Sequence, residues 1–144
     1  MSGRHAAGTI KGTVMEAPAR LTEGGATVVV IEPDARERER IGRELAGPSL
    51  HLEFFSNSRD ARRHLQEHDC DLVVTEMLLG PWDDGIKFIK WANGRLPNVP
   101  VVISTAYPAY RGEFINFMAA AYTVKSDGLW ELKHAVSRLL GRHR

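Results

Sequence analysis

Short apolar runs, rich in β-branched residues, alternate along the chain with stretches whose apolar residues recur every three or four positions. Such runs are typical of buried strands, and the recurring positions are typical of helices that cover a sheet. Strands are predicted at residues 27–31, 50–55, 71–76, 101–104 and 120–124. The first helix is predicted at about 35–46, and a second one begins after a cap at Ser56 or Ser58. Three more helices are predicted at about 84–93 (with Gly94 as C-cap), 109–119 and 128–140.

Strands that alternate with helices over short connections predict right-handed β–α–β units and a parallel sheet. For five strands in one domain, the flavodoxin-like strand order 2-1-3-4-5 fits best. The predicted fold class is therefore α/β, a doubly wound five-stranded parallel sheet with five helices, over residues 26–142. Residues 1–25 hold five of the 13 glycines and are interpreted as a flexible tail, in which Ile10, Val14 and Met15 could form a small extra element.

Composition narrows the class of protein. The 144 residues are 43% hydrophobic and 26% charged, which is typical of one globular domain. No apolar run approaches the roughly 20 residues that span a bilayer, and the beginning lacks the apolar segment of a signal peptide. The net charge of +1 offers no footprint for nucleic acid, and the single cysteine, Cys70, cannot form an internal disulfide. We therefore expect a cytoplasmic protein that binds neither membranes nor nucleic acid.

Polar side chains gather where the predicted strands end. The strand at 71–76 stops at Glu76, and the loop that follows contains Gly80 and Pro81. In an open α/β sheet the carboxyl ends of the strands form the edge at which ligands bind. Taken singly, Asp34 has an adequate role as a helix N-cap and Lys125 as a surface lysine, so only their conjunction indicates a site. Four residues join Glu76 at this edge: Glu32, Asp34, Thr105 and Lys125.

Residues 27–141 resemble the receiver domain of bacterial response regulators. Residues 71–85, with Glu76, are similar to the phosphoacceptor strand and its loop, and residues 101–106, with Thr105, to the switch-threonine segment. Tyr122 and Lys125 match the switch aromatic residue and the lysine three positions after it. The resemblance implies a domain that takes a phosphoryl group from a histidine kinase onto an aspartate, with Mg²⁺ bound by the acidic cluster. It also implies that phosphorylation draws in the threonine and reorients the aromatic residue.

The chain departs from this family pattern at its phosphoacceptor and at its metal site. Glu76 replaces the aspartate, and Pro33 stands between Glu32 and Asp34 where a carboxylate normally ligates the metal. Because Mg²⁺ demands near-octahedral oxygen ligands, only a weak site is expected, or none, with Glu32, Asp34 and Glu76 as its remaining ligands. The longer Glu76 side chain also displaces the nucleophile, and a misplacement of about 1 Å can cost on the order of 10²-fold in rate.

These departures favour a pseudo-receiver, which is not an enzyme, needs no cofactor and acts by protein contacts without aspartyl phosphorylation. Two alternatives stay open: a receiver that still accepts a phosphoryl group, on Glu76, Asp83 or Asp84, and a flavodoxin-like cofactor-binding protein. The latter is disfavoured because residues 32–34 offer acid where a phosphate would bind. A hydrolase is weaker still, since the six histidines do not fall at strand ends beside a nucleophile; His51 begins a strand, and His64 is interpreted as a helix-surface residue.

The longer reach of Glu76 carries its carboxylate toward Lys125 and Thr105, where phosphoryl oxygens would sit in the family that the chain resembles. An opposite charge within about 4–6 Å favours the ionised form of each partner. Glu76 is therefore predicted to contact Lys125 as a built-in stand-in for the phosphorylated state. That state would have Thr105 drawn in and Tyr122 turned inward.

The chain ends soon after the last predicted helix, which predicts a stand-alone receiver without an attached output domain. Its partner is then another signalling protein, a histidine kinase or a downstream effector. The resemblance places the contact surface at about residues 109–140. At least three of the aromatic residues there are expected in the core; the five are Tyr110, Phe114, Phe117, Tyr122 and Trp130.

Overall fold

The computed structural model describes residues 13–15 and 25–141, and only the backbone of residues 13–15 and 113–117. These residues form a six-stranded sheet in the order β1-β3-β2-β4-β5-β6. The five strands from β2 to β6 run parallel in the predicted order 2-1-3-4-5, which confirms the fold class. The strands are β1 (Thr13–Met15), β2 (Ala26–Ile31), β3 (Leu50–Phe55), β4 (Leu72–Thr75), β5 (Val101–Thr105) and β6 (Ala121–Val124).

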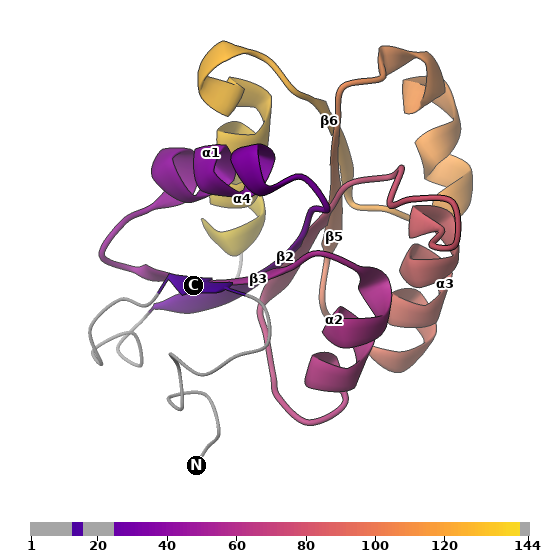
Figure 1. Ribbon diagram of the computed structural model, residues 1–144, viewed down its shortest axis with the longest axis horizontal. Coiled ribbons are helices and arrows are strands. Elements are labelled where there is room, and N and C mark those ends of the chain that lie inside the picture. Colours follow the sequence, from indigo (N-terminus) through magenta and orange to yellow (C-terminus); the bar gives the residue numbers. More distant parts are fainter. Residues whose placement is uncertain (1–12, 16–24, 142–144) are drawn as a thin grey trace.

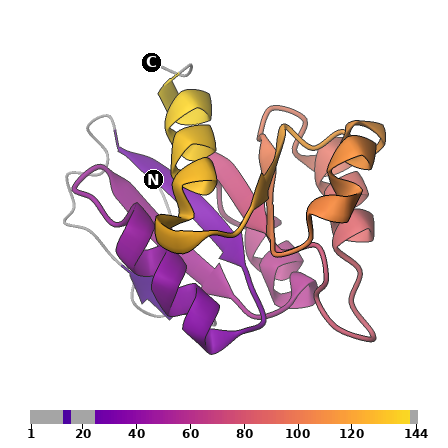
Figure 2. The same ribbon diagram turned by 90° about the horizontal axis from the view of Figure 1, so that it is seen from above.

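Helices cover both faces of this sheet, as Figures 1 and 2 show, with α1 and α4 on one face and α2 and α3 on the other. Neighbouring residues of β2 point to opposite faces, so Val28 packs toward α1 and α4 while Val29 packs toward α2 and α3. This two-sided burial explains why the strands are continuous apolar runs. The helices are α1 (Ala35–Leu45), α2 (Ser58–Leu65), α3 (Gly85–Arg95) and α4 (Trp130–Gly141), with 3₁₀ helices η3 (Pro108–Phe117) and η4 (Asp127–Leu129).

Strand β1 lies within the predicted tail. It pairs antiparallel with β3, with Val14 opposite Glu53 and Met15 opposite Leu52. The small extra element around Val14 and Met15 is thus a strand, while Ile10 and the other residues of 1–12 and 16–24 lie outside the described part of the chain. The pairing covers backbone groups of β3 that would otherwise stand exposed as a sheet edge.

Several helix predictions need correction. The segment predicted as a helix at 109–119 is the 3₁₀ helix η3, because Gly112 in its middle lowers the propensity for a regular α-helix. Asn57, rather than Ser56 or Ser58, caps α2, since its side chain accepts a hydrogen bond from the backbone N–H of Asp60. Helix α3 continues through Gly94, the predicted C-cap, to Arg95.

Gly85 opens α3 where that helix meets the end of β4. A Cβ at this position would lie 2.6 Å from the carbonyl oxygen of Met77 and 2.9 Å from that of Glu76. Both atoms belong to the backbone, so they cannot swing away. The absence of a side chain at Gly85 therefore lets α3 pack against the residue at the centre of the predicted site.

We expect Gly85→Ala to lower the free energy of unfolding by about 1–3 kcal/mol, because the added methyl overpacks a backbone contact. Gly94→Ala, in the same helix, is the matched control: no atom lies within 4 Å of its Cβ position. That variant should gain about 0.5–1 kcal/mol from helix propensity. Urea denaturation of both proteins measures the difference, and equal effects would contradict the proposed contact.

A buried polar cluster joins β3 to α2. Glu53 accepts hydrogen bonds from His51 at 3.1 Å and from His64 at 2.7 Å, and all three side chains are at least nine-tenths buried. Burial acts to raise the pKa of Glu53, but the hydrogen bonds with His51 and His64 outweigh it and lower that pKa to about 2. The sequence predicts His64 on the helix surface; its side chain instead faces the sheet, because its ring reaches from α2 to Glu53 of β3.

This cluster should make folding sensitive to acid. Because the pKa of Glu53 is about 2 when folded and 4.5 by default, its stabilisation is present above pH 4.5 and is lost as the pH falls toward 2. Between pH 6 and pH 3 the wild type should lose about 2 kcal/mol more than Glu53→Gln. Urea denaturation at the two pH values measures the free energy of unfolding of both proteins. Equal losses in the wild type and in Glu53→Gln would mean that groups other than Glu53 cause the acid sensitivity.

Candidate functional site

Lys125 binds two glutamates at the carboxyl edge of the sheet. Its Nζ lies 2.9 Å from Oε1 of Glu32 and 2.9 Å from Oε1 of Glu76. Glu32 directly follows β2, Glu76 follows β4 and Lys125 follows β6. The three side chains are 3%, 8% and 10% exposed, in that order. The structure thus brings together three of the residues that the sequence placed at this edge.

The electrostatics reflect one ammonium shared by two carboxylates. Burial acts to lower the pKa of Lys125, but hydrogen bonds with Glu76 and Glu32 outweigh it, so that pKa is raised. Burial raises the pKa of Glu32, and the single lysine together with the backbone N–H of Asp34 does not fully offset it, since Glu76 adds like charge. Lys125 is paired with two negative charges, so its pKa rises. Glu32 has only a share of one positive charge, so burial still raises its pKa.

The second carboxylate oxygen of Glu76 fixes the loop after β4. Oε2 accepts hydrogen bonds from the backbone N–H groups of Met77 at 2.7 Å and Leu78 at 3.1 Å. Both oxygens of Glu76 are therefore engaged, one by a cation and one by backbone amides. This arrangement ties the loop that begins at Met77 to the end of β6.

Thr105 ends β5 at the same edge of the sheet, but its hydroxyl is not hydrogen-bonded to Glu32, Glu76 or Lys125. The residue is fully buried, its backbone carbonyl accepts from the N–H of Lys125 at 2.8 Å, and its hydroxyl has no partner among the described residues. The prediction that Glu76 draws in Thr105 is therefore not met for the hydroxyl. A phosphoryl group offers three oxygens, whereas a carboxylate offers two, and both oxygens of Glu76 are already engaged.

Tyr122 points inward. It is 6% exposed, and its hydroxyl donates a hydrogen bond to the backbone carbonyl of Tyr107. Burial raises the pKa of Tyr122, and the negative charge of Glu76 adds to the effect. The aromatic residue thus connects the segment after β5 to the region of the buried glutamate.

The strand-end residues do not fit a Mg²⁺ ion. Asp34 is exposed and caps α1 by accepting from the N–H of Arg36 at 2.8 Å. Arg38 donates to the backbone carbonyls of Glu32 at 2.7 Å and Pro33 at 3.0 Å. The ammonium of Lys125 bonds to both remaining carboxylates, Glu32 and Glu76. Among residues 13–15 and 25–141, no group of three or more histidine, cysteine, aspartate or glutamate side chains is placed to hold a metal ion.

Asp83 and Asp84, the alternative phosphoacceptors, have structural contacts of their own. The carboxylate of Asp83 accepts from the backbone N–H of Ser58 at 2.8 Å and from its hydroxyl. Asp84 caps α3 and accepts from the N–H of Ile86 at 2.9 Å. These two acids therefore hold the loop between β4 and α3 in place.

Three of the five aromatic residues of segment 109–140 have described side chains, and the expectation that at least three of the five lie in the core stays a prediction. Tyr110 is 44% and Trp130 is 62% exposed, whereas Tyr122 is buried. The side chains of Phe114 and Phe117 lie outside the described part of the structure. Sequence reasoning also passed over Trp82, which is 97% exposed and follows Gly80 and Pro81 in a loop. Its position next to these turn residues, outside any apolar repeat, could have predicted from the sequence that Trp82 is exposed.

The parallel sheet, its switch-point edge and the buried lysine–glutamate contacts define a flavodoxin-like domain of the signal-receiver type. The family model of the response regulator receiver domain matches residues 28–137. The chain therefore belongs to the response regulator receiver domain family of two-component signalling. Within its described residues, the structure contains no helix long and apolar enough to cross a membrane.

Solved structures have the same fold. The response regulator TrrA from Thermotoga maritima, determined in complex with Mg²⁺ and BeF, is 24% identical, with a TM-score of 0.73 over 79% of this chain and 98% of that one. The receiver domain of the Francisella response regulator 1452 is 21% identical, with a TM-score of 0.72 over 83% and 100%. A CheY-like receiver domain protein from Methanospirillum hungatei is 15% identical, with a TM-score of 0.73 over 82% and 95%. A comparison with curated proteins finds no match.

The unpaired hydroxyl of Thr105 gives a direct test of the site geometry. We expect Thr105→Val to raise the free energy of unfolding by about 1 kcal/mol, because it removes a buried polar group that has no partner. Thr123 in β6 is the matched control, since it is also buried and its hydroxyl donates to the carbonyl of Ile103 at 2.7 Å. Thr123→Val should lose about 1 kcal/mol. Urea denaturation compares them, and a destabilised Thr105→Val would mean that its hydroxyl is bonded.

Proposed function

We propose that the chain is a pseudo-receiver that signals by protein contacts without aspartyl phosphorylation, with Glu76 as a built-in stand-in for the phosphorylated state. The observation that supports this most is the 2.9 Å contact between Glu76 and Lys125. In the family, the lysine at this position is expected to meet the phosphoryl group. Here a side chain of the protein itself supplies the negative charge.

The same contact disfavours phosphoryl acceptance. An attack by Glu76 on a phosphodonor would require one of its oxygens to leave either Lys125 or the amides of Met77 and Leu78. The extra methylene shifts the carboxylate from the position of an aspartate, and Pro33 removes a metal ligand. Each of these changes acts against in-line phosphoryl transfer, which depends on accurate positioning and on metal charge.

Glu76 reproduces only part of what a phosphoryl group would do. It engages a lysine and backbone amides but leaves the hydroxyl of Thr105 unbonded. A buried ion pair adds little net stability, because the cost of desolvating both charges offsets much of their attraction, whereas moving a two-state equilibrium from 1:99 to 99:1 takes about 5.5 kcal/mol. The pair therefore tilts the domain toward an active-like form, and the packing of buried Tyr122 contributes the remainder.

The partner of such a domain is another signalling protein, a histidine kinase or a downstream effector. Segment 109–140 is the proposed contact surface. It presents the exposed rings of Tyr110 and Trp130, and an ion pair between Arg111 and Glu131 joins η3 to α4. Exposed aromatic residues are enriched among those that dominate binding energy at protein interfaces.

The proposal predicts no phosphorylation of the wild type. Incubation with acetyl phosphate and Mg²⁺, followed by phosphate-affinity electrophoresis, should leave the wild type unshifted. The double variant Pro33→Asp/Glu76→Asp restores the family's residues and should become retarded. The single variant Glu76→Asp separates the role of side-chain length from that of the missing metal ligand.

A second readout tests the stand-in role. In Glu76→Gln the neutral amide loses the ionic contact with Lys125, so NMR signals of Tyr122 and of residues 105–107 should shift toward a second conformation. The control is Glu37→Gln, whose carboxylate lies 3.9 Å from the same ammonium. A retarded band for the wild type, absent in Glu76→Ala, would overturn the pseudo-receiver. Unchanged Tyr122 signals in Glu76→Gln would overturn the stand-in role alone.

A further inference from the structure

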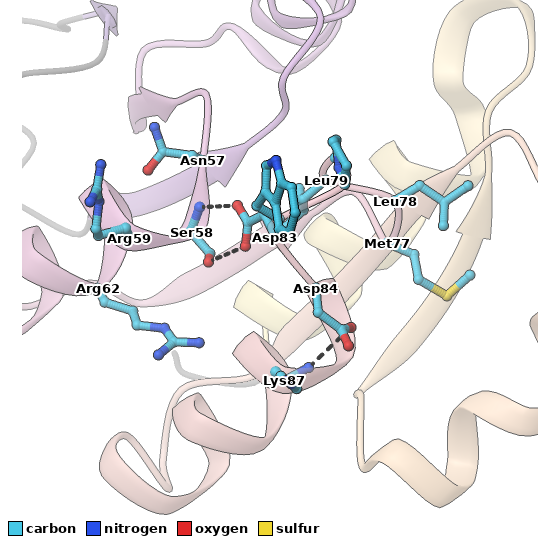
Figure 3. Close-up of a pocket in the computed structure, with 13 residues that line it drawn as sticks. Asn57, Ser58, Arg59, Arg62, Met77, Leu78, Leu79, Asp83, Asp84 and Lys87 are labelled. Atoms are coloured by element: carbon cyan, nitrogen blue, oxygen red, sulfur yellow. Dashed lines mark hydrogen bonds between the residues drawn. The ribbon is translucent and has the colours of Figure 1, made fainter.

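An open pocket of about 1400 Å³ lies between the beginning of α2 and the loop that joins β4 to α3. Figure 3 shows Arg59 and Arg62 of α2 on one side, Met77 and Leu78 on the other, and Asp83 between them. None of the residues that line the pocket belongs to segment 109–140. The pocket is therefore a second surface at which the domain could meet another molecule.

The loop side of this pocket is apolar. Met77 and Leu79 are each 5% exposed, whereas Leu78 is 51% and Trp82 is 97% exposed. Leaving an indole almost wholly in water forgoes the largest hydrophobic gain available to a side chain. Tryptophan is also strongly enriched among the residues that carry binding energy at interfaces. These features indicate an apolar anchor point for a partner.

The charges around the pocket are unbalanced. Within the described residues, Arg59 and Lys87 form no ion pair, and Arg62 contacts the ring of Trp91, with 5.6 Å from its guanidinium carbon to the ring centroid. The Nε of Arg62 is buried without a hydrogen-bond partner there. Two acids also line the pocket, and the oxygens of both are engaged within the chain, since Asp83 is bonded to Ser58 and Asp84 caps α3. Three cationic side chains against two carboxylates leave the lining with an excess of positive charge.

We infer that this pocket binds an acidic linear segment of a partner protein, with an aromatic or aliphatic side chain seated beside Leu78 and Trp82. Its carboxylates would meet Arg59, Arg62 and Lys87. An apolar floor and a net charge of only +1 fit such a peptide better than nucleic acid, whose binding depends on a broad basic surface. The inference depends on this charge pattern and does not require the proposed role of Glu76.

The pocket is nevertheless connected to the buried glutamate. Met77 and Leu78 form its apolar side, and their N–H groups donate to Oε2 of Glu76. The carboxylate that Lys125 holds therefore also sets the course of the loop. A change at Glu76 would alter the shape of the pocket as well as the neighbourhood of Tyr122.

A selection from a phage-displayed library of random twelve-residue peptides against the full chain tests the inference. The selected peptides should be rich in aspartate and glutamate around one aromatic or aliphatic residue. A labelled consensus peptide, followed by fluorescence anisotropy, should bind Trp82→Ala and Arg59→Glu/Lys87→Glu at least about tenfold more weakly than wild type. Affinity should fall as salt rises, because the charged contacts are solvent-exposed.

The double variant Arg36→Glu/Arg43→Glu is the matched control, since it reverses two exposed cations on α1, outside the pocket and outside segment 109–140. It should bind the peptide as the wild type does, and circular dichroism verifies that every variant is folded. Recovery of no peptide, a basic consensus, or equal binding to the pocket variants would overturn the inference. Tighter binding of a single-stranded oligonucleotide, lost in Trp82→Ala, would assign the pocket to nucleic acid instead. None of these outcomes depends on whether Glu76 is phosphorylated.

Discussion

The contact of one ammonium with two buried carboxylates organises the functional edge of this domain. Lys125 follows β6, and its ammonium contacts Glu76 after β4 and Glu32 after β2. Because β5 lies between β6 and β4 in the sheet, the lysine side chain crosses the carboxyl end of β5. The loops after three strands are thereby joined through one atom, Nζ. Thr105 ends β5 and is completely buried. Breaking this contact by removing the lysine would leave two carboxylates uncompensated in a poorly solvated place, which is far more costly than losing a surface ion pair.

The length of the Glu76 side chain decides how this edge is used. It lets one carboxylate meet the lysine and the amides of the following loop at the same time. Asp34 caps α1 and Arg38 donates to the strand-end carbonyls, so groups of the chain itself also engage these two polar positions. Under the proposed function, an internal lysine and an internal acid stand in place of a metal ion and a transferable group. The departures at Pro33 and Glu76 are thus physically consistent with one another.

Much of this arrangement could be predicted from the sequence, because it depends on simple rules. Strands buried on both faces must be continuous apolar runs, and parallel strands must bring residues such as Glu32, Glu76 and Lys125 to one edge. The remainder depends on geometry that no pattern encodes. Which donors claim the two oxygens of Glu76, and so leave Thr105 unbonded, is settled only by distances. The burial of His64 and the exposure of Trp82 likewise depend on how α2 and the loop after β4 pack.

A negative charge that is part of the polypeptide behaves differently from one that is transferred to it. Under the proposed function, the carboxylate of Glu76 can neither dissociate nor be hydrolysed, so the domain has no internal clock that returns it to rest. Its signal would persist for as long as the chain itself exists. Information would then reside in how many copies the cell makes and how quickly it destroys them. Such a domain would report abundance, where a phosphorylated receiver reports the recent activity of a kinase.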